Sequence, residues 1–192
     1  MKSCVIIPAR YASTRFPGKP LVPLLGRPMV QWVADLAAKA VGKANVFVAT
    51  DNNMIANVVE EHGFKAIMTS GSALTGTDRI AEVADIIDYD IYINLQGDEP
   101  LVDPNDIVKA IELKQLNPDC VVNAYCIMTD DEDPNSINIP KVITNENNVL
   151  VYMSRKALPG YKDLKSMPYS YKKQVCIYAF SKSELTMFKN FG

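Results

Sequence analysis

The sequence predicts an α/β protein with a doubly wound, mostly parallel β-sheet, and three observations lead to this prediction. Short apolar segments alternate along the chain with segments whose apolar residues recur at helical spacing. Several of the strand-like segments are followed directly by polar residues, as at the ligand-binding edge of such sheets. Hydrophobic residues make up 48% of the 192 residues, which is ordinary for a globular chain and sufficient for one core.

The individual elements follow in chain order. The apolar, strand-like segments lie at 5–8, 46–49, 65–68, 91–95 and 121–127. The predicted helices between them lie at 29–41, 54–61, 77–87 and 104–116. Gly42 and Gly63 follow two of these helices, and Pro104 begins another, which are the positions where glycine and proline are favoured. The alternation predicts parallel strands covered by helices on both faces.

After residue 128 the pattern changes. The later segments are an acidic loop at 130–134, strands at 149–153 and 175–180, and a last helix beginning at 184–188. We expect residues 128–180 to form an antiparallel excursion, a lid or dimer arm, within a single domain that spans 1–192. Its apolar face would contact a second copy of the chain through Val149, Val151, Met153, Val175, Ile177 and Phe180.

Composition excludes several classes of protein. A net charge of −2 gives no overall electrostatic case for binding nucleic acid or an acidic membrane. No apolar run is long enough to cross a bilayer or to act as a signal peptide, so we expect a cytoplasmic protein. The four cysteines contain no Cys-x-x-Cys pair, which favours buried thiols over disulfides or zinc ligands. The single histidine, His62, precedes Gly63 and is expected to end a helix.

The most informative segment is PARYASTRFPGK, residues 8–19, which directly follows the first predicted strand. It places the cations Arg10, Arg15 and Lys19 around hydroxyl side chains that include Ser13. No acidic residue occurs before Asp35. A glycine-bearing loop of this kind can hold a polyphosphate through backbone N–H groups and charge-assisted hydrogen bonds.

This loop differs from the two common nucleotide-binding motifs. A P-loop needs Gly-x-x-x-x-Gly-Lys-Ser/Thr, but Ser13 replaces the first glycine and Pro20 replaces the hydroxyl residue. The Gly-x-Gly-x-x-Gly dinucleotide motif is also absent from the sequence. The loop therefore indicates nucleotide phosphates without indicating an ATPase or a dehydrogenase.

A second polar motif, Gln96-Gly97-Asp98-Glu99-Pro100, follows the strand predicted at 91–95. Because the carboxyl ends of parallel strands meet at one edge of a sheet, Asp98 is expected to face the first loop. A carboxylate opposite phosphates needs a cation between them, and Mg²⁺ suits that arrangement. The sequence therefore predicts a magnesium-dependent nucleotide site.

Four segments in order, PARYASTRFPGKPL, TGTDRIAEV, INLQGDEP and VYMSRKALP, resemble the cytidylyltransferases that activate 3-deoxy-manno-octulosonate (Kdo). This family is also called CMP-Kdo synthetase, and the resemblance covers nearly the whole chain. It implies a Rossmann-like fold, a homodimer, and transfer of CMP from CTP to the anomeric hydroxyl of the sugar acid. Pyrophosphate is released, and the product serves lipopolysaccharide or capsule synthesis.

The resemblance also implies a role for each matching residue. Arg10, Lys19 and Asp98 would be catalytic, and Asp98 would bind Mg²⁺. The nucleotide would be held by Ala9, Arg10, Ser13, Arg15, Lys19, Thr75, Gly76, Asp78 and Arg79. The sugar acid would contact Gln96, Arg155, Gln174 and Tyr178.

The sequence departs from the family pattern at three points. Ala73 and Gln174 stand where the family has histidines, and glutamine can hydrogen-bond but cannot become cationic. A 3-deoxy sugar acid related to Kdo therefore stays open as the acceptor. Family members also continue past residue 192 with a second metal-binding aspartate, so we expect the chain to be C-terminally incomplete. Two alternatives stay open: a sugar-phosphate nucleotidyltransferase, and a binding homologue without catalytic activity.

Overall fold

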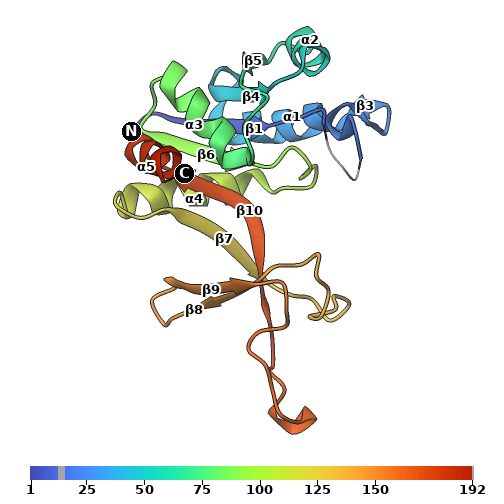
Figure 1. Ribbon diagram of the computed structural model, residues 1–192, viewed down its shortest axis with the longest axis vertical. Helices are drawn as coiled ribbons and strands as arrows, with labels where there is room; N and C mark the ends of the chain where they lie inside the picture. Colours follow the sequence, from blue (N-terminus) through green and yellow to red (C-terminus); the bar gives the residue numbers. More distant parts are fainter. Residues whose placement is uncertain (13–15, 192) are drawn as a thin grey trace. The chain divides into compact units, whose positions relative to one another are not determined.

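A computed structural model describes residues 1–12 and 16–191 of the chain. The chain forms two compact units (Figure 1): Met1–Val122 together with the stretch beginning at Cys176, and Asn123–Val175. The second unit overlaps the arm predicted at 128–180 but begins and ends earlier. The assignment of one domain to residues 1–192 stays a prediction.

The first unit is an α/β sandwich, as predicted. Its strands are β1 (Ser3–Pro8), β4 (Val46–Thr50), β5 (Lys65–Met68), β6 (Ile91–Leu95) and the end of β10 (Lys172–Phe180). They are ordered β5-β4-β1-β6-β10, with parallel pairing from β5 to β6. Its helices are α1 (Met29–Val41), α2 (Asn53–Glu61), α3 (Gly76–Ile86), α4 (Pro104–Leu116) and α5 (Lys182–Asn190).

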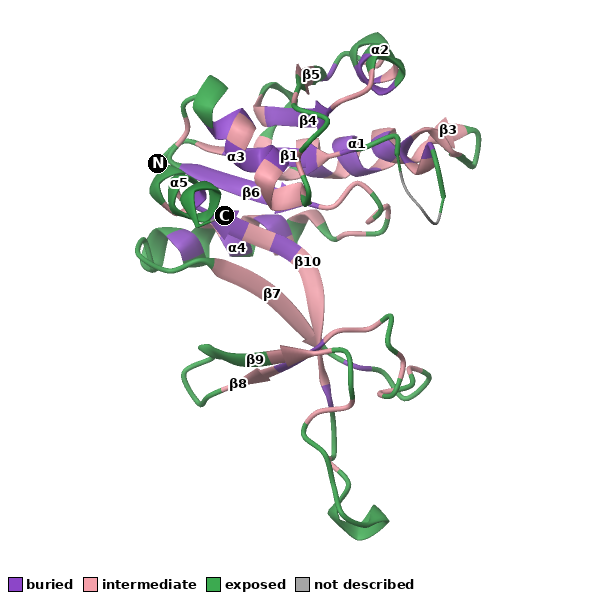
Figure 2. Ribbon diagram, viewed as in Figure 1, coloured by how far each residue is buried: buried purple, intermediate pink, exposed green. Residues whose placement is uncertain are grey.

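Both faces of the central strands are buried (Figure 2). Cys4 and Ile6 of β1 pack with Ile80 of α3 and Leu185 of α5 on one face. Helices α1 and α4 contact β1 and β6 respectively and also contact each other. Covering both faces explains why these strands are continuous apolar runs rather than alternating ones.

Two short strands, β2 (Pro23–Leu24) and β3 (Arg27–Pro28), form a small hairpin before α1 that the sequence did not predict. Three-residue 3₁₀ helices lie at Lys19–Leu21 (η1), Lys43–Asn45 (η2) and Leu164–Ser166 (η3). His62 caps the C-terminus of α2, and its Nδ1 lies 2.6 Å from the carbonyl oxygen of Val58, so the predicted helix end is confirmed.

The second unit is antiparallel, as predicted for this part of the chain. It contains β8 (Lys141–Thr144), β9 (Leu150–Ser154), most of β7 (Val122–Ile127) and the start of β10. β8 pairs antiparallel with β9, and Lys173 of β10 pairs antiparallel with Lys141 of β8. β8 was not predicted from the sequence, because its four residues do not form a distinct apolar run.

Three predictions need correction. The fifth strand, β7, does not continue the parallel sheet, because β10 occupies the edge beside β6 and β7 pairs with β10. Ile177 and Phe180 are not an exposed face: they are 0% and 7% exposed, because this half of β10 joins the main sheet. None of the four cysteines forms a disulfide, as expected, but only Cys4 is buried: Cys126 and Cys176 are partly exposed and Cys120 is exposed. Within the described part of the chain, no helix is both long and apolar enough to cross a membrane.

Candidate active site

Three segments converge at the carboxyl end of the main sheet: the end of β1, the segment after β6 and the start of α3. A Cβ on Gly76 would lie 3.1 Å from Pro8 Cγ and 3.2 Å from Gln96 Nε2. A Cβ on Gly97 would lie 3.2 Å from the carbonyl oxygen of Pro8. The two glycines therefore allow close contacts with Pro8 and Gln96 that larger residues would obstruct, and this places both predicted motifs at one edge.

Lys19 and Asp98 join these motifs directly. Lys19 Nζ lies 2.5 Å from Asp98 Oδ2, although the two residues are 79 positions apart in sequence. Their side chains are 40% and 48% exposed. An exposed ion pair contributes little to stability, so both charges can be transferred to a ligand at small cost. The structure thus brings together two of the three predicted catalytic residues.

The base of the first loop is closed by Gly18 and Tyr11. The amide of Gly18 donates to the carbonyl of Tyr11 over 2.9 Å. Gly18 has φ of +69°, and a Cβ there would lie 3.2 Å from the Tyr11 ring, so both backbone and space favour glycine. Gly18 directly precedes η1, which begins with Lys19.

The other predicted residues of this loop are less informative. Ala9 is buried, and its amide donates to Ala49 of β4, so it anchors the loop. Arg10 is exposed, as a phosphate-binding cation must be. Ser13 and Arg15 lie outside the described residues, and their roles stay predictions.

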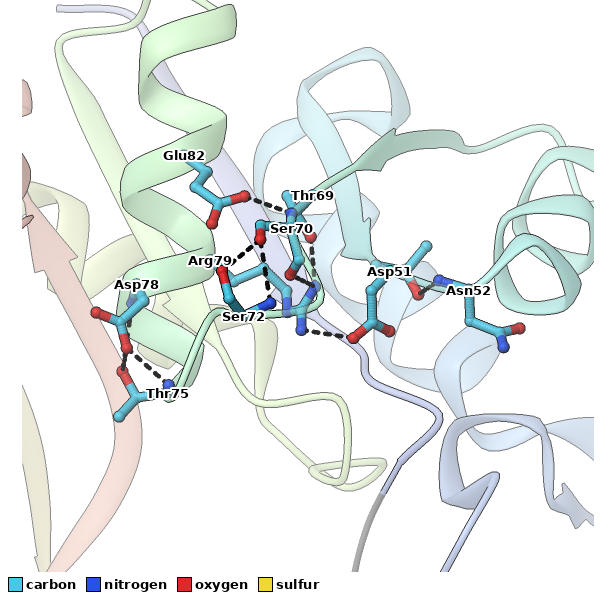
Figure 3. A network of polar contacts seen from close by, with 10 residues as sticks. Asp51, Asn52, Thr69, Ser70, Ser72, Thr75, Asp78, Arg79 and Glu82 are labelled. Carbon is cyan, nitrogen blue, oxygen red and sulfur yellow. Dashed lines mark hydrogen bonds and ion pairs between the residues drawn. The ribbon is translucent and has the colours of Figure 1, made fainter.

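Arg79 has a different environment from the one expected of a pocket-lining residue (Figure 3). It is 3% exposed, and its Nη2 donates to Asp51 Oδ2 over 3.0 Å. Its Nη1 donates to Thr69 Oγ1 and to the carbonyl of Ser70. The guanidinium therefore holds the segments after β4 and β5 against α3, and its contact with nucleotide stays a prediction.

Thr75 and Asp78 form the capping box of α3 (Figure 3). Asp78 Oδ2 accepts from the amide and hydroxyl of Thr75, at 2.7 Å each, and Thr75 Oγ1 accepts from the amide of Asp78. These bonds satisfy donors at the start of the helix beside Gly76. Both side chains thus stabilise the N-terminus of α3, where the positive end of the helix dipole lies.

Asp98 is chemically suited to Mg²⁺. The described residues contain no cluster of three or more histidine, cysteine or carboxylate side chains that could enclose a metal ion. Mg²⁺ keeps several waters and is usually bound by one or two carboxylates together with substrate phosphates. Asp98 is a half-exposed carboxylate and so offers one ligand of that kind.

Comparison with known proteins gives the family. A family model described as cytidylyltransferase matches residues 4–191. The chain belongs to the cytidylyltransferase family. The CMP-Kdo synthetase resemblance seen in the sequence is confirmed by the relatives described next.

A 3-deoxy-manno-octulosonate cytidylyltransferase of Trichlorobacter lovleyi is 45% identical over 168 residues, covering 85% of this chain and 65% of that protein. An 8-amino-3,8-dideoxy-manno-octulosonate cytidylyltransferase of Shewanella frigidimarina is 39% identical, covering 98% of this chain and 78% of that protein. A solved CMP:2-keto-3-deoxy-manno-octonic acid synthetase complexed with CTP is 36% identical, with a TM-score of 0.91, covering 100% of this chain and 79% of that one. This chain thus spans just under two thirds of the first relative, and the Rossmann-like fold is confirmed.

The residues predicted to bind the sugar acid fall in both units. Gln96 follows β6, and its Nε2 donates to Asn94 Oδ1 over 3.0 Å. Tyr178 of β10 stacks on Phe180 with ring centroids 6.0 Å apart, and burial raises the pKa of its phenol. Arg155 and Gln174 belong to the second unit. Within that unit, Arg155 is exposed and its Nη1 donates to the carbonyl of Ile137 over 2.7 Å.

Two charged residues with structural contacts, Asp51 and Lys141, were not singled out from the sequence. Asp51 follows the strand β4 directly, so the rule that singled out Asp98 also applied to it. Lys141 gave no such signal, because the strand that carries it was not predicted. Its side chain is 0% exposed and donates only to backbone carbonyls.

Proposed function

We propose that this chain transfers CMP from CTP to the anomeric hydroxyl of Kdo or a related 3-deoxy sugar acid, releasing pyrophosphate. The observation that carries the proposal is the Lys19–Asp98 pair, which joins a basic loop and an acidic motif at the carboxyl edge of the sheet. Membership of the cytidylyltransferase family and the names of the relatives support it. Because the first relative is longer than this chain, the activity of the whole protein is a proposal.

The first step is binding of the triphosphate. Lys19 leaves Asp98 for a phosphate oxygen, and Arg10 supplies a second charge-assisted contact. The start of α3 lies beside this edge, where Gly76 keeps space next to Pro8 and Gln96. Helix N-termini attract anions through their unpaired amides and dipole, so α3 favours the same ligand.

The second step is displacement at the α-phosphorus. The anomeric hydroxyl gives its proton to water, and its oxygen forms a bond to that phosphorus while the bond to the oxygen bridging to the β-phosphate breaks, so that pyrophosphate leaves. When bound at Asp98, Mg²⁺ supplies neutralisation of phosphate charge. Lys19 and Arg10 stabilise the negative charge that develops on the leaving group, so positioning and electrostatics suffice without a covalent enzyme intermediate.

The acceptor is a sugar acid whose carboxylate pairs with Arg155 of the second unit, where Gln174 offers a neutral hydrogen-bonding group. In the first unit, Gln96 and Tyr178 are the predicted contacts of the sugar acid. Gln174 is neutral, whereas the histidine that the family has at this position can become cationic. Relatives named for Kdo and for its 8-amino derivative make these two compounds the acceptors to test first.

We further propose a homodimer located in the cytoplasm. The apolar residues at the start of β9 support the dimer: Val149, Leu150, Val151 and Tyr152 are 59%, 49%, 63% and 59% exposed. A contiguous apolar surface on an exposed strand is typical of a protein–protein contact. Light scattering of Val151→Glu against the unaltered chain tests this, since a monomer mass for both would remove the proposal.

The decisive experiment measures pyrophosphate release. The chain is incubated with Mg²⁺, one acceptor (Kdo, its 8-amino derivative or a sugar 1-phosphate) and CTP, UTP, ATP or GTP. We expect release with CTP and a 3-deoxy sugar acid only. Equal rates with ATP would contradict the cytidylyltransferase proposal, and release with a sugar 1-phosphate would support the alternative enzyme class. Binding of CTP without release would identify a binding homologue.

A further inference from the structure

Lys141 is a buried cation that the proposed reaction does not use. It lies at the start of β8, entirely within the second unit, and is 0% exposed. Burying an ammonium group is costly unless its N–H groups are hydrogen-bonded, so a lysine retained in this position needs an explanation. Three acceptors surround its ammonium group.

Each of these acceptors is a backbone carbonyl. Lys141 Nζ donates to Ser136 at 2.8 Å, to Ile139 at 2.6 Å and to Arg155 at 2.8 Å. An ammonium group has three N–H donors, so the set matches its full capacity. Burial lowers the pKa of Lys141, with the charge of Arg155 acting in the same direction and that of Asp133 opposing it. The lysine thus fastens two separate segments, 136–139 and the residue after β9, to one point.

Those two segments also meet a second time. Arg155 Nη1 donates to the carbonyl of Ile137, which lies between the two loop carbonyls that Lys141 holds. The backbone of Arg155, through Lys141, and its guanidinium, directly, are therefore both bound to the same four-residue loop. A guanidinium has five N–H donors, so one bond to Ile137 orients it and leaves others for a carboxylate.

We propose that Lys141 is a positioning residue, which fixes the loop 136–139 and the backbone of Arg155 so that the guanidinium presents a preset fork to the carboxylate of the acceptor. This inference rests on the proposed function, in which Arg155 binds that carboxylate. Lys141 itself touches no substrate. Its effect is on binding of the acceptor alone, because the only proposed substrate contact among the groups that it holds is Arg155.

The first test needs no substrate. Hydrogen–deuterium exchange is compared for the unaltered chain, Lys141→Gln and the control Lys156→Gln, which alters an exposed lysine next to Arg155. The amides of Ser136 and Ile139 donate to backbone carbonyls and are the reporters. We expect their exchange to rise by about tenfold or more in Lys141→Gln only, as local opening becomes easier. Unchanged exchange in Lys141→Gln would overturn the proposal.

The second test separates positioning from general stability. Lys141→Gln should raise the KM for the sugar acid by about tenfold or more while the KM for CTP stays within about twofold. Adding Lys141→Gln to Arg155→Ala should cause no further increase, since Lys141 acts through Arg155. Equal increases in both KM values, or an additive double variant, would overturn the proposal.

Lys141→Arg guards against a variant that does not fold. It keeps the charge but displaces the donors, so the KM for the sugar acid should lie between that of the unaltered chain and that of Lys141→Gln. If Lys141→Gln is insoluble, Lys141→Arg should still raise this KM above that of the unaltered chain. An unchanged acceptor KM in folded Lys141→Arg, together with unchanged exchange, would overturn the proposal. If the unaltered chain releases no pyrophosphate, the proposed function fails, whereas the exchange experiment still decides whether Lys141 holds the loop 136–139.

Discussion

Two ion pairs lie at the carboxyl edge of the main sheet, and they differ in almost every property except their chemistry. Lys19 and Asp98 are 40% and 48% exposed and have one contact with each other. Arg79 and Asp51 are 3% and 20% exposed, and Arg79 also bonds to the segment after β5. The comparison teaches that burial, rather than residue type, separates charges that a ligand can take from charges that hold the edge in shape.

The energetic reason lies in solvation. An exposed pair in water contributes about 0–1 kcal/mol, because solvent stabilises each charge nearly as well as its partner does. A buried charge that loses its partner is left unsolvated, which costs roughly 3–5 kcal/mol. The exposed pair can therefore exchange partners during binding, while the buried pair cannot.

The largest expected effect is on stability. Arg79→Met should lower the free energy of unfolding by about 3–5 kcal/mol, because Asp51 and the carbonyl of Ser70 lose their donor. Lys19→Met, the matched exposed change, should stay within about 1 kcal/mol of the unaltered chain. Equilibrium urea unfolding measures both. Similar losses of unfolding free energy in the two variants would contradict the difference proposed between the buried and the exposed ion pair.

The next effect is on turnover, where the order reverses. Lys19→Met and Asp98→Asn should each cost about 1.5–3 kcal/mol of transition-state stabilisation, or roughly tenfold to a hundredfold in kcat/KM for CTP. The control Lys39→Met changes an exposed lysine of α1 and should leave kcat/KM unaltered. Asp98→Asn should also raise the Mg²⁺ concentration needed for half-maximal rate. An unaltered metal requirement would make Asp98 a structural residue.

Much of this edge could be predicted from the sequence, since it depends on local signals. The strands 65–68 and 91–95 and the helix 104–116 have the predicted bounds in the structure. Asp98 was singled out because it follows a strand, and its contact with Lys19 then follows from the parallel topology. Nothing in the sequence predicted that Arg79 is buried, because its partners Asp51 and Thr69 follow two other strands.

The second unit was less predictable for the same reason. Its pairing depends on contacts between segments far apart in sequence, such as Lys173 with Lys141. β10 reads as one strand, yet its two halves belong to different units, which is why Ile177 was assigned to an exposed face. Nothing in the apolar pattern marks where such a strand passes from one environment to the other.

A smaller effect concerns the metal alone. Because Asp98 is paired with Lys19 before ligands bind, a metal ion must displace the lysine. Lys19→Met should therefore tighten binding of Mn²⁺, used as a probe without nucleotide, by up to about fivefold, equivalent to less than 1 kcal/mol. Titration calorimetry measures this, with Lys39→Met as the control. Weaker Mn²⁺ binding in Lys19→Met would show that the pair does not compete with the metal.

The smallest expected effect extends the comparison to a pair of intermediate exposure in the second unit, Lys173 and Glu132, at 27% and 21%. The hydrogen bond from Lys173, followed by that from the amide of Thr129, holds the pKa of Glu132 below its usual value of 4.5. A carboxyl with a lowered pKa in the folded state binds fewer protons than in the unfolded state. Its contribution to stability is therefore present above pH 4.5 and is lost as the pH falls through the folded pKa.

Glu132→Gln removes this titration while keeping similar size. The melting temperature of the unaltered chain should exceed that of Glu132→Gln at pH 6, and the difference should shrink as the pH is lowered towards about 3, since protonation removes the charge that Lys173 recognises. Lys173→Met should show the same pH dependence, because it removes the other partner of the pair. A difference that stays constant across this range would mean that Glu132 acts through its bonds to Thr129. The relation between the burial of an ion pair and its contribution to stability would then hold only for the two pairs of the main sheet.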